Sequence, residues 1–271
     1  MKDFKMPKMP GMPDMGAFFN QKQDPKNPSI VGAGTIKGGT FESLSISGSG
    51  EVDGDVKATS ISTAGSAQLN GSVKADTLDS SGSLSIDGSL EAKKLSIAGS
   101  IDVHGPVHAK EISFGGASLI DGNVTADSFS AKGGIRIEGT VKSDVIDIEL
   151  SGRSNVKALM GKKIRVARGE NNSSSRGGRV VNRSYVGSVT IDGRNVSGTE
   201  SVTVTESINE QRLEAREIEG DEVDLENTTA ETVTGTRVVV GEGCQIGTVR
   251  YSESLDVHEN ATVKLRSKIS R

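Results

Sequence analysis

A repeat of 17 residues constrains the fold of this chain more than any other feature. From Gly48 to Glu149 the sequence divides without gaps into six such units, the first of which reads GSGEVDGDVKATSISTA. Unit position 1 is glycine in every copy, and so is position 7. The position-7 residues are Gly54, Gly71, Gly88, Gly105, Gly122 and Gly139. Because six copies stay in register, the structure itself must repeat along the chain.

The apolar residues inside each unit predict short strands. Positions 5, 9 and 14 are aliphatic in all copies except for Phe129, and position 11 is alanine except for Ser143. Stretches such as Ile86–Leu90 alternate with a period of two, which indicates a strand and not a helix. Glycines at fixed phase permit positive φ at corners between strands. The repeat therefore predicts an all-β solenoid of about 17 residues per coil, with positions 5, 9, 11 and 14 lining its interior.

The rest of the sequence divides around this repeat. We expect a disordered Met/Pro-rich tail at 1–29, a solenoid core at 30–166, an irregular insertion at 167–212, a solenoid-like extension at 213–265 and a basic tail at 266–271. In the extension Ile218, Val223, Thr228, Val233 and Val238 recur every five residues, so three steps make a 15-residue turn. The insertion contains β-like stretches around 188–191 and 201–205.

Composition excludes several classes of function. A net charge of −4 argues against a general nucleic-acid binder. The single cysteine excludes an internal disulfide and is typical of a reducing compartment, so we expect a cytoplasmic protein. No apolar run approaches the roughly 20 residues that a membrane-spanning helix needs. Neither a Walker loop nor a GxGxxG fingerprint opens a helix, so we predict no nucleotide and no other cofactor.

We also predict that the chain is not an enzyme and holds no metal. His104 and His108 occupy outward-facing unit positions, whereas a trimeric β-helical carbonic anhydrase would need three histidines that converge on zinc. Cys244 has apolar neighbours, and such a cysteine is more often part of a core than a nucleophile. Paired carboxylates across a groove stay open as an alternative, as does a left-handed β-helical enzyme that works as a trimer.

The G-x-x-x-Φ-x-G-x-V-x-A units resemble the bactofilin family of polymer-forming cytoskeletal proteins. The resemblance covers roughly 31–166, and 218–251 is similar to the C-terminal extension of longer members. It implies a right-handed β-helix that polymerises end to end without nucleotide. It also implies a scaffold at the inner face of the membrane, with a role in cell shape or in the assembly of surface structures, and with cytoplasmic or membrane proteins as partners. The chain departs from the compact family pattern by its long extension after the repeat, which can cap one end of the rod.

The two ends of a solenoid are its natural assembly surfaces, because their strand edges are unpaired. We predict self-assembly into a homopolymer through residues of the first and last coils. These self-assembly candidates are Ile36, Leu44, Ile46, Val263 and Leu265. The alternative is that both ends are capped and the rod is a monomeric protein-binding module.

The N-terminal tail is a candidate for contact with a membrane surface. Its methionines recur every three residues, which is the period of polyproline II, and lysines at 2, 5 and 8 add positive charge. The membrane-contact candidates are Phe4, Met6, Met9, Met12, Met15, Phe18 and Phe19.

Two blocks of opposite charge follow the repeat. Residues 161–194 are strongly basic and residues 200–231 are strongly acidic. Such blocks can mate between subunits or recruit a charged partner. The plainer interpretation is a solvated surface that keeps the protein soluble.

Overall fold

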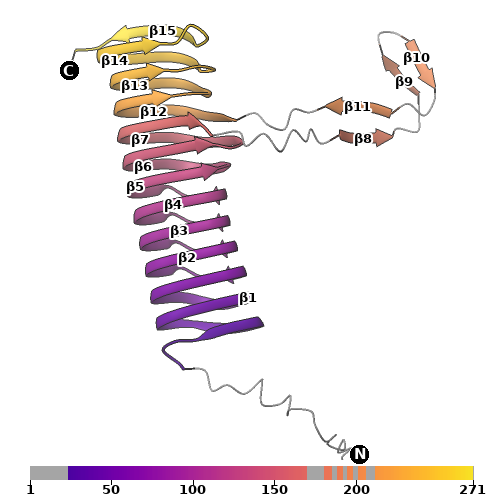
Figure 1. Ribbon diagram of the computed structural model, residues 1–271, viewed down its shortest axis with the longest axis vertical. Coiled ribbons are helices and arrows are strands. Elements are labelled where there is room, and N and C mark those ends of the chain that lie inside the picture. The colour runs from indigo at the N-terminus through magenta and orange to yellow at the C-terminus, as the bar shows by residue number, and fades with distance from the viewer. Residues whose placement is uncertain are drawn as a thin grey trace, which may run out of the picture.

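The computed structural model is a rod of stacked β coils (Figure 1). It describes residues 24–169 and 211–270, together with the backbone of four short strands between them. Eleven strands form one sheet in the order β1-β2-β3-β4-β5-β6-β7-β12-β13-β14-β15, and each register between neighbours is parallel. The predicted all-β solenoid is confirmed, with about ten turns and no helix among the described residues.

Most strands of the sheet correspond to one coil, and β1 runs through several. The strands of the N-terminal part are β1 (Ser29–Leu69), β2 (Val73–Ile86), β3 (Leu90–Val103), β4 (Val107–Ile120), β5 (Val124–Gly133), β6 (Ile135–Leu150) and β7 (Arg153–Arg168). The strands of the C-terminal part are β12 (Arg212–Leu225), β13 (Thr228–Val240), β14 (Gln245–Val257) and β15 (Thr262–Lys268).

The interior of the rod is built from columns of identical unit positions. All residues at positions 5, 9, 11 and 14 of the six units are buried, as predicted. Positions 3 and 16 also face inward, and sequence analysis missed them because several copies carry a small or polar residue there. Thr63 and Ser80 are two such residues, and the Thr63 hydroxyl donates a 2.7 Å hydrogen bond to the Ser80 oxygen one coil away. Stacking in register thus satisfies this polar pair inside the core.

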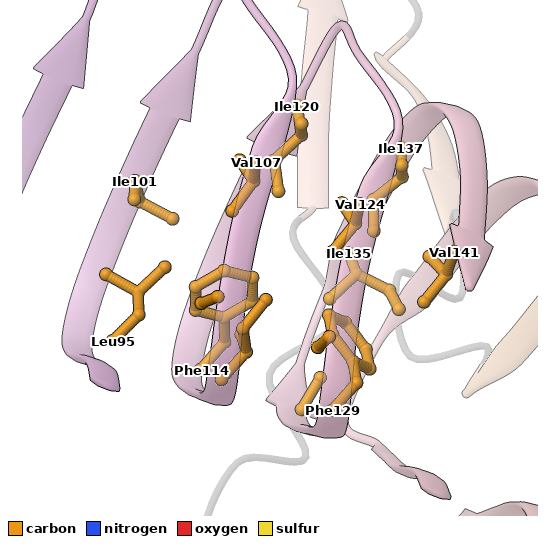
Figure 2. Packing of buried hydrophobic residues seen from close by; sticks show 14 of the residues in the cluster. Leu95, Ile101, Val107, Phe114, Ile120, Val124, Phe129, Ile135, Ile137 and Val141 are labelled. Carbon is orange, nitrogen blue, oxygen red and sulfur yellow. The ribbon is translucent and has the colours of Figure 1, made fainter. Parts of the chain in front are cut away.

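The two buried phenylalanines fit into this interior because a small residue follows the first of them in its column. Phe114 of β4 and Phe129 of β5 pack edge to face, with ring centroids 5.8 Å apart (Figure 2). Ala131 follows Phe114 in its column, so the second ring has room. A narrow interior filled in this way explains why the chain needs few aromatic residues.

The two invariant glycine columns have different physical causes. Position-1 glycines have positive φ, for example +131° at Gly82, and a Cβ there would lie 2.1 Å from the carbonyl oxygen of Gly65. Among the position-7 glycines only Gly54 has positive φ. The expectation of positive φ is therefore wrong for Gly71, Gly88, Gly105, Gly122 and Gly139. The first four lie at bends between strands and Gly139 lies within β6, and at all five a Cβ would come within 2.7 Å of the preceding coil.

The C-terminal strands continue the same solenoid, and the first step among them, from β12 to β13, is shorter than the 17-residue repeat. Leu213 pairs with Thr228, Ile218 with Val233 and Val223 with Val238, which is the 15-residue step expected from the sequence. β12 pairs directly with β7 in parallel. The register runs from Arg153 opposite Arg212 to Val166 opposite Leu225. The long connection between them therefore does not interrupt the rod.

Four short strands lie within that connection. They are β8 (Val180–Ser184), β9 (Ser188–Ile191), β10 (Arg194–Ser197) and β11 (Ser201–Thr205). β8 pairs with β11 and β9 with β10, both antiparallel, in two sheets separate from the rod. The strands β9 and β11 match the two β-like stretches that the sequence indicates.

Candidate functional site: the two ends of the rod

A half-coil covers part of the N-terminal end. Residues 24–29, which the sequence assigns to the tail, turn beneath the first full coil instead. The Lys26 carbonyl accepts hydrogen bonds from the amides of Glu42 and Ser43, and the Pro28 carbonyl accepts one from Ser45. The turn is held by Asp24, whose pKa is lowered by hydrogen bonds from the Asn27 side chain and the Lys26 amide.

This half-coil removes two of the predicted assembly residues from the end face. Leu44 and Ile46 are each only 1% exposed. Their prediction as surface contacts is wrong because the strand that contains them bonds to Lys26 and Pro28. Two side-chain hydrogen bonds join residues that are 16 positions apart, namely Lys26 with Glu42 and Asn27 with Ser43. This spacing, close to the length of one coil, was the signal in the sequence that could have revealed the half-coil.

The rest of the N-terminal end is uncovered by any described residue. Val31 is 84% exposed, the highest value among the large apolar residues of the described chain. Ile36 and Phe41 are half-buried and pack against the core from this end. Ile36 thus remains a candidate, and Val31 and Phe41 are additions that the sequence analysis did not single out.

The C-terminal end is also incompletely covered. β15 pairs only with Gln245–Tyr251 of β14, so the second half of β14 has no further described strand over it. Leu255, Val257 and Val263 are half-buried there, and Leu265 is 59% exposed. The predicted residues Val263 and Leu265 therefore do lie at an end of the rod.

Charge interrupts one interior column at this end. Arg266 is in register with Val249, which continues the buried column of Ile218 and Val233. Arg266 itself is exposed. A charged residue over an apolar column is the kind of polar cap that limits further stacking in solenoids, whereas Val263 over Ile246 keeps its own column apolar.

A long groove follows one side of the rod. Its N-terminal part has a volume of about 1430 Å³ and is lined by unit positions 2, 3 and 4, among them Ser66, Ser83 and Ser100. A second part of about 920 Å³ continues toward β15, and Glu138, Asn155 and Glu214 line both. A row of serines lines the first part, and charged side chains of both signs line both parts.

The strands that carry the described parts of the two charge blocks are neighbours in the sheet. β7 carries six Lys or Arg and no acidic residue, and β12 carries six Asp or Glu. Arg153 forms a 2.6 Å ion pair with Glu214 across these strands, and the Arg168 amide donates to Glu226 at 2.9 Å. Within the basic block, however, Lys162 and Arg165 form their ion pairs with Asp144 and Asp147 of β6, so only part of the opposite charge meets across β7 and β12.

Chemistry-bearing side chains are dispersed over the surface or buried in the core. His104 and His108 are exposed, as predicted, and the His104 ring lies 3.5 Å from Asp87. Cys244 is buried, its thiol donates to the Leu225 carbonyl, and desolvation raises its pKa to about 11. Among the described residues no three His, Cys, Asp or Glu side chains gather into a group that could hold a metal ion.

The membrane-contact candidates from Phe4 to Phe19 lie outside the described residues. In the part of the chain that the structure describes, no helix is long and apolar enough to span a membrane.

The fold defines the chain as a parallel β-solenoid protein with two incompletely covered ends. A 58-residue stretch is 41% identical to the uncharacterized protein YhbF of Bacillus subtilis (strain 168), and 57 residues are 44% identical to YhbE of the same organism. Each match covers 21% of this chain and about a quarter of the relative. No family model and no solved structure matches the chain.

Proposed function

We propose that this chain is a cytoskeletal scaffold of the bactofilin kind, in which solenoids stack end to end into filaments without nucleotide. The observation that carries the proposal is the change in burial along the interior columns. In the middle of the rod the residues of these columns are buried. At the two ends their counterparts, such as Ile36 and Val263, are only half-buried.

An open end of the rod has unpaired strand edges and half-exposed apolar side chains, and stacking of another copy covers both. The uncovered strand edges gain hydrogen-bond partners, and the half-exposed apolar side chains are removed from water. Charged residues occupy many outward positions on the sides, for example Lys74, Glu91 and Lys93. Side-by-side association is therefore weaker than stacking along the axis.

A pair of matched substitutions tests this mode of assembly. Val263→Glu places a charge on the apolar column at the C-terminal end, and Val239→Glu places the same charge on the side of the rod, where the valine is already 41% exposed. Light scattering should show large assemblies for the wild type and for Val239→Glu. Val263→Glu should give small particles with an unchanged β circular-dichroism spectrum. Equal assembly of both variants contradicts stacking through this end.

The N-terminal tail supports a place for the filament at the cytoplasmic face of a membrane. One short basic and apolar segment binds lipid weakly, but many such segments on one filament bind together. Removal of residues 1–23 should abolish flotation with anionic liposomes and leave assembly intact. Unchanged flotation contradicts a membrane role of the tail. A scaffold at this place would serve cell shape or the assembly of surface structures.

The groove favours a second candidate function, that of a protein-binding module that does not polymerise. It is long enough to hold an extended peptide against the side of the rod. In that case the wild type would be a monomer in light scattering. The acidic block contributes less to this alternative than the sequence suggests, because β12 already faces the basic strand β7.

A further inference from the structure

The rod stops partway round a coil at each end, so each end face has a step. At the C-terminal end β15 lies over Gln245–Tyr251 of β14, and the Ile269 amide bonds to the Tyr251 carbonyl. Residues 252–257 of β14 have no described strand over them. These six residues form a recess one layer deep in the C-terminal end face.

The recess occupies unit positions 12 to 16 of the solenoid. Val257 is in register with Val240 and ends the interior column of position 16. Leu255 is in register with Val238 and ends the column of position 14. Both Leu255 and Val257 are only half-buried. The recess is therefore the place where two apolar columns of the core stop without a cover.

The half-coil at residues 24–29 carries the same unit positions at the N-terminal end. Its side-chain bonds join residues that are 16 apart, such as Lys26 and Glu42. This spacing places Lys26 at position 12, Pro28 at position 14 and Ile30, which follows directly, at position 16. The N-terminal end therefore projects at the positions where the C-terminal end is recessed. In turn, β15 projects at positions that the first coil leaves uncovered.

We propose that the recess at 252–257 is the docking surface for the half-coil 24–29 of a second copy. The rods then join head to tail, with one fixed rotation about their common axis. The contact is heterologous, so each copy uses one end as the donor of the half-coil and the other end as its acceptor. This inference rests on the proposed end-to-end assembly, and it adds the polarity, the register and the residues in contact.

Docking in this register continues three apolar columns across the junction. Ile30 lies over the recess at position 16 and Pro28 covers Leu255 at position 14, while Ile36 of the first coil meets Val263 of β15 at position 5. Leu255, Val263 and Ile36 are half-buried in the single chain, so the contact gains their removal from water. The column of position 9 contributes nothing, because Arg266 interrupts it.

Charge and strand direction favour this orientation over the two symmetric ones. The recess carries Glu253 and Asp256, and docking places Lys26 over position 12, next to Glu253. Two C-terminal ends brought together would oppose two copies of β15, which has three Lys or Arg and no acidic residue. Two N-terminal ends brought together would set their edge strands antiparallel, whereas head-to-tail docking keeps the parallel register of the rod.

Single cysteines in two full-length chains test the orientation. Ser29→Cys in one chain and Asp256→Cys in the other lie at position 15 of the half-coil and of the recess, and both sites are exposed. Register partners on adjacent parallel strands are within disulfide range. We therefore expect a disulfide-linked heterodimer as the major cross-linked species after mixing and oxidation. Neither chain alone should cross-link, and Cys244 is buried in both.

Ser45→Cys is the matched control, because it has the same outward position one coil further in, under the chain's own half-coil. Mixed with the Asp256→Cys chain, it should give no heterodimer. A heterodimer as abundant as that of Ser29→Cys would show contact through the sides of the rods and overturn the docking. Homodimers of Ser29→Cys in place of the heterodimer would show head-to-head stacking and also overturn it.

Light scattering of the same chains under reducing conditions separates this inference from the proposed function. Large assemblies whose Ser29→Cys and Asp256→Cys mixture gives no heterodimer contradict head-to-tail docking and leave the scaffold in place. Chains that stay single rods, with the wild type as the reference, contradict both.

Discussion

The repeat half of the rod, β1–β6, and the C-terminal half, β12–β15, build the same parallel sheet by different means. The repeat half has 17-residue coils whose register is fixed by glycines, because adjacent backbones approach too closely for a Cβ. The C-terminal half begins with a 15-residue step from β12 to β13 and returns to steps of 16 and 17 residues at β14 and β15, and its glycine column consists of Gly220 and Gly235 and ends at Tyr251. Charged side chains bridge the coils in both halves: Lys74 pairs with Glu91 in the repeat half, and Arg237 pairs with both Glu222 and Glu253 in the C-terminal half. Close backbone approach therefore recurs at a fixed phase of every coil in the repeat half, whereas in the C-terminal half it occurs at isolated positions such as Gly247, where a Cβ would lie 2.5 Å from the Glu231 carbonyl oxygen.

The largest difference should appear when the same substitution is made in the two halves. Gly82→Ala must accommodate a Cβ 2.1 Å from a backbone oxygen at positive φ, so we expect a loss of about 4 kcal/mol or more in the free energy of unfolding. Gly220→Ala meets its nearest backbone atom at 3.0 Å without positive φ, and its loss should be about 1 kcal/mol. Urea denaturation measures both.

Gly152→Ala is the control, because nothing lies within 4 Å of its added Cβ. Equal losses for Gly82→Ala and Gly220→Ala would show that close backbone approach does not distinguish the two halves.

Much of the repeat half was predictable, because six copies average out the exceptions. The interior positions 5, 9, 11 and 14 follow from alternation alone. Positions 3 and 16 did not, since residues such as Thr63, Ser80 and Ser118 look outward-facing by polarity and are nevertheless buried. Their burial depends on the neighbouring coil, which the local sequence does not describe.

The ends of the rod were harder to predict than the middle, because the apolar pattern of a coil does not show whether another segment covers that coil. Leu44 and Ile46 have the same apolar pattern as an exposed end coil. Only the hydrogen bonds from Glu42, Ser43 and Ser45 to residues 26–28 reveal the half-coil beneath them. Similarly, the charge blocks were visible in the sequence, but their meeting across β7 and β12 depends on the fold.

A smaller effect on stability is expected from removal of the half-coil at residues 24–29, which covers part of the N-terminal end. Deletion of 1–23 leaves the half-coil in place, so stability should change little. Deletion of 1–29 uncovers Leu44 and removes the hydrogen bonds to Lys26 and Pro28, which should cost about 2–3 kcal/mol. Thermal unfolding of the two truncated chains in parallel measures the difference. Identical melting temperatures would mean that 24–29 does not stabilise the first coil.

The smallest effects should come from neighbouring acids of β12 whose pKa values shift in opposite directions. The hydrogen bond from Arg237 lowers the pKa of Glu222, so this carboxylate stabilises the fold above its unfolded pKa, and the contribution is lost as pH falls. Desolvation raises the pKa of Asp224, so its ionisation disfavours the fold as pH rises.

Glu222→Gln should therefore lower the melting temperature slightly at pH 7 and have less effect near pH 3. Asp224→Asn should raise it slightly at pH 7, again with less effect in acid. Differential scanning calorimetry of both variants across this range checks the signs. The same sign for both at pH 7 would contradict the assigned environments.

Electron microscopy of the full-length protein, negatively stained and without added nucleotide, tests the central claim most directly. About ten coils at roughly 4.8 Å give a subunit of about 50 Å along the axis. End-to-end stacking predicts long unbranched filaments one solenoid wide, which Val263→Glu shortens to single rods. Dispersed rods of about 50 Å from the wild-type chain would contradict end-to-end assembly and favour the binding module.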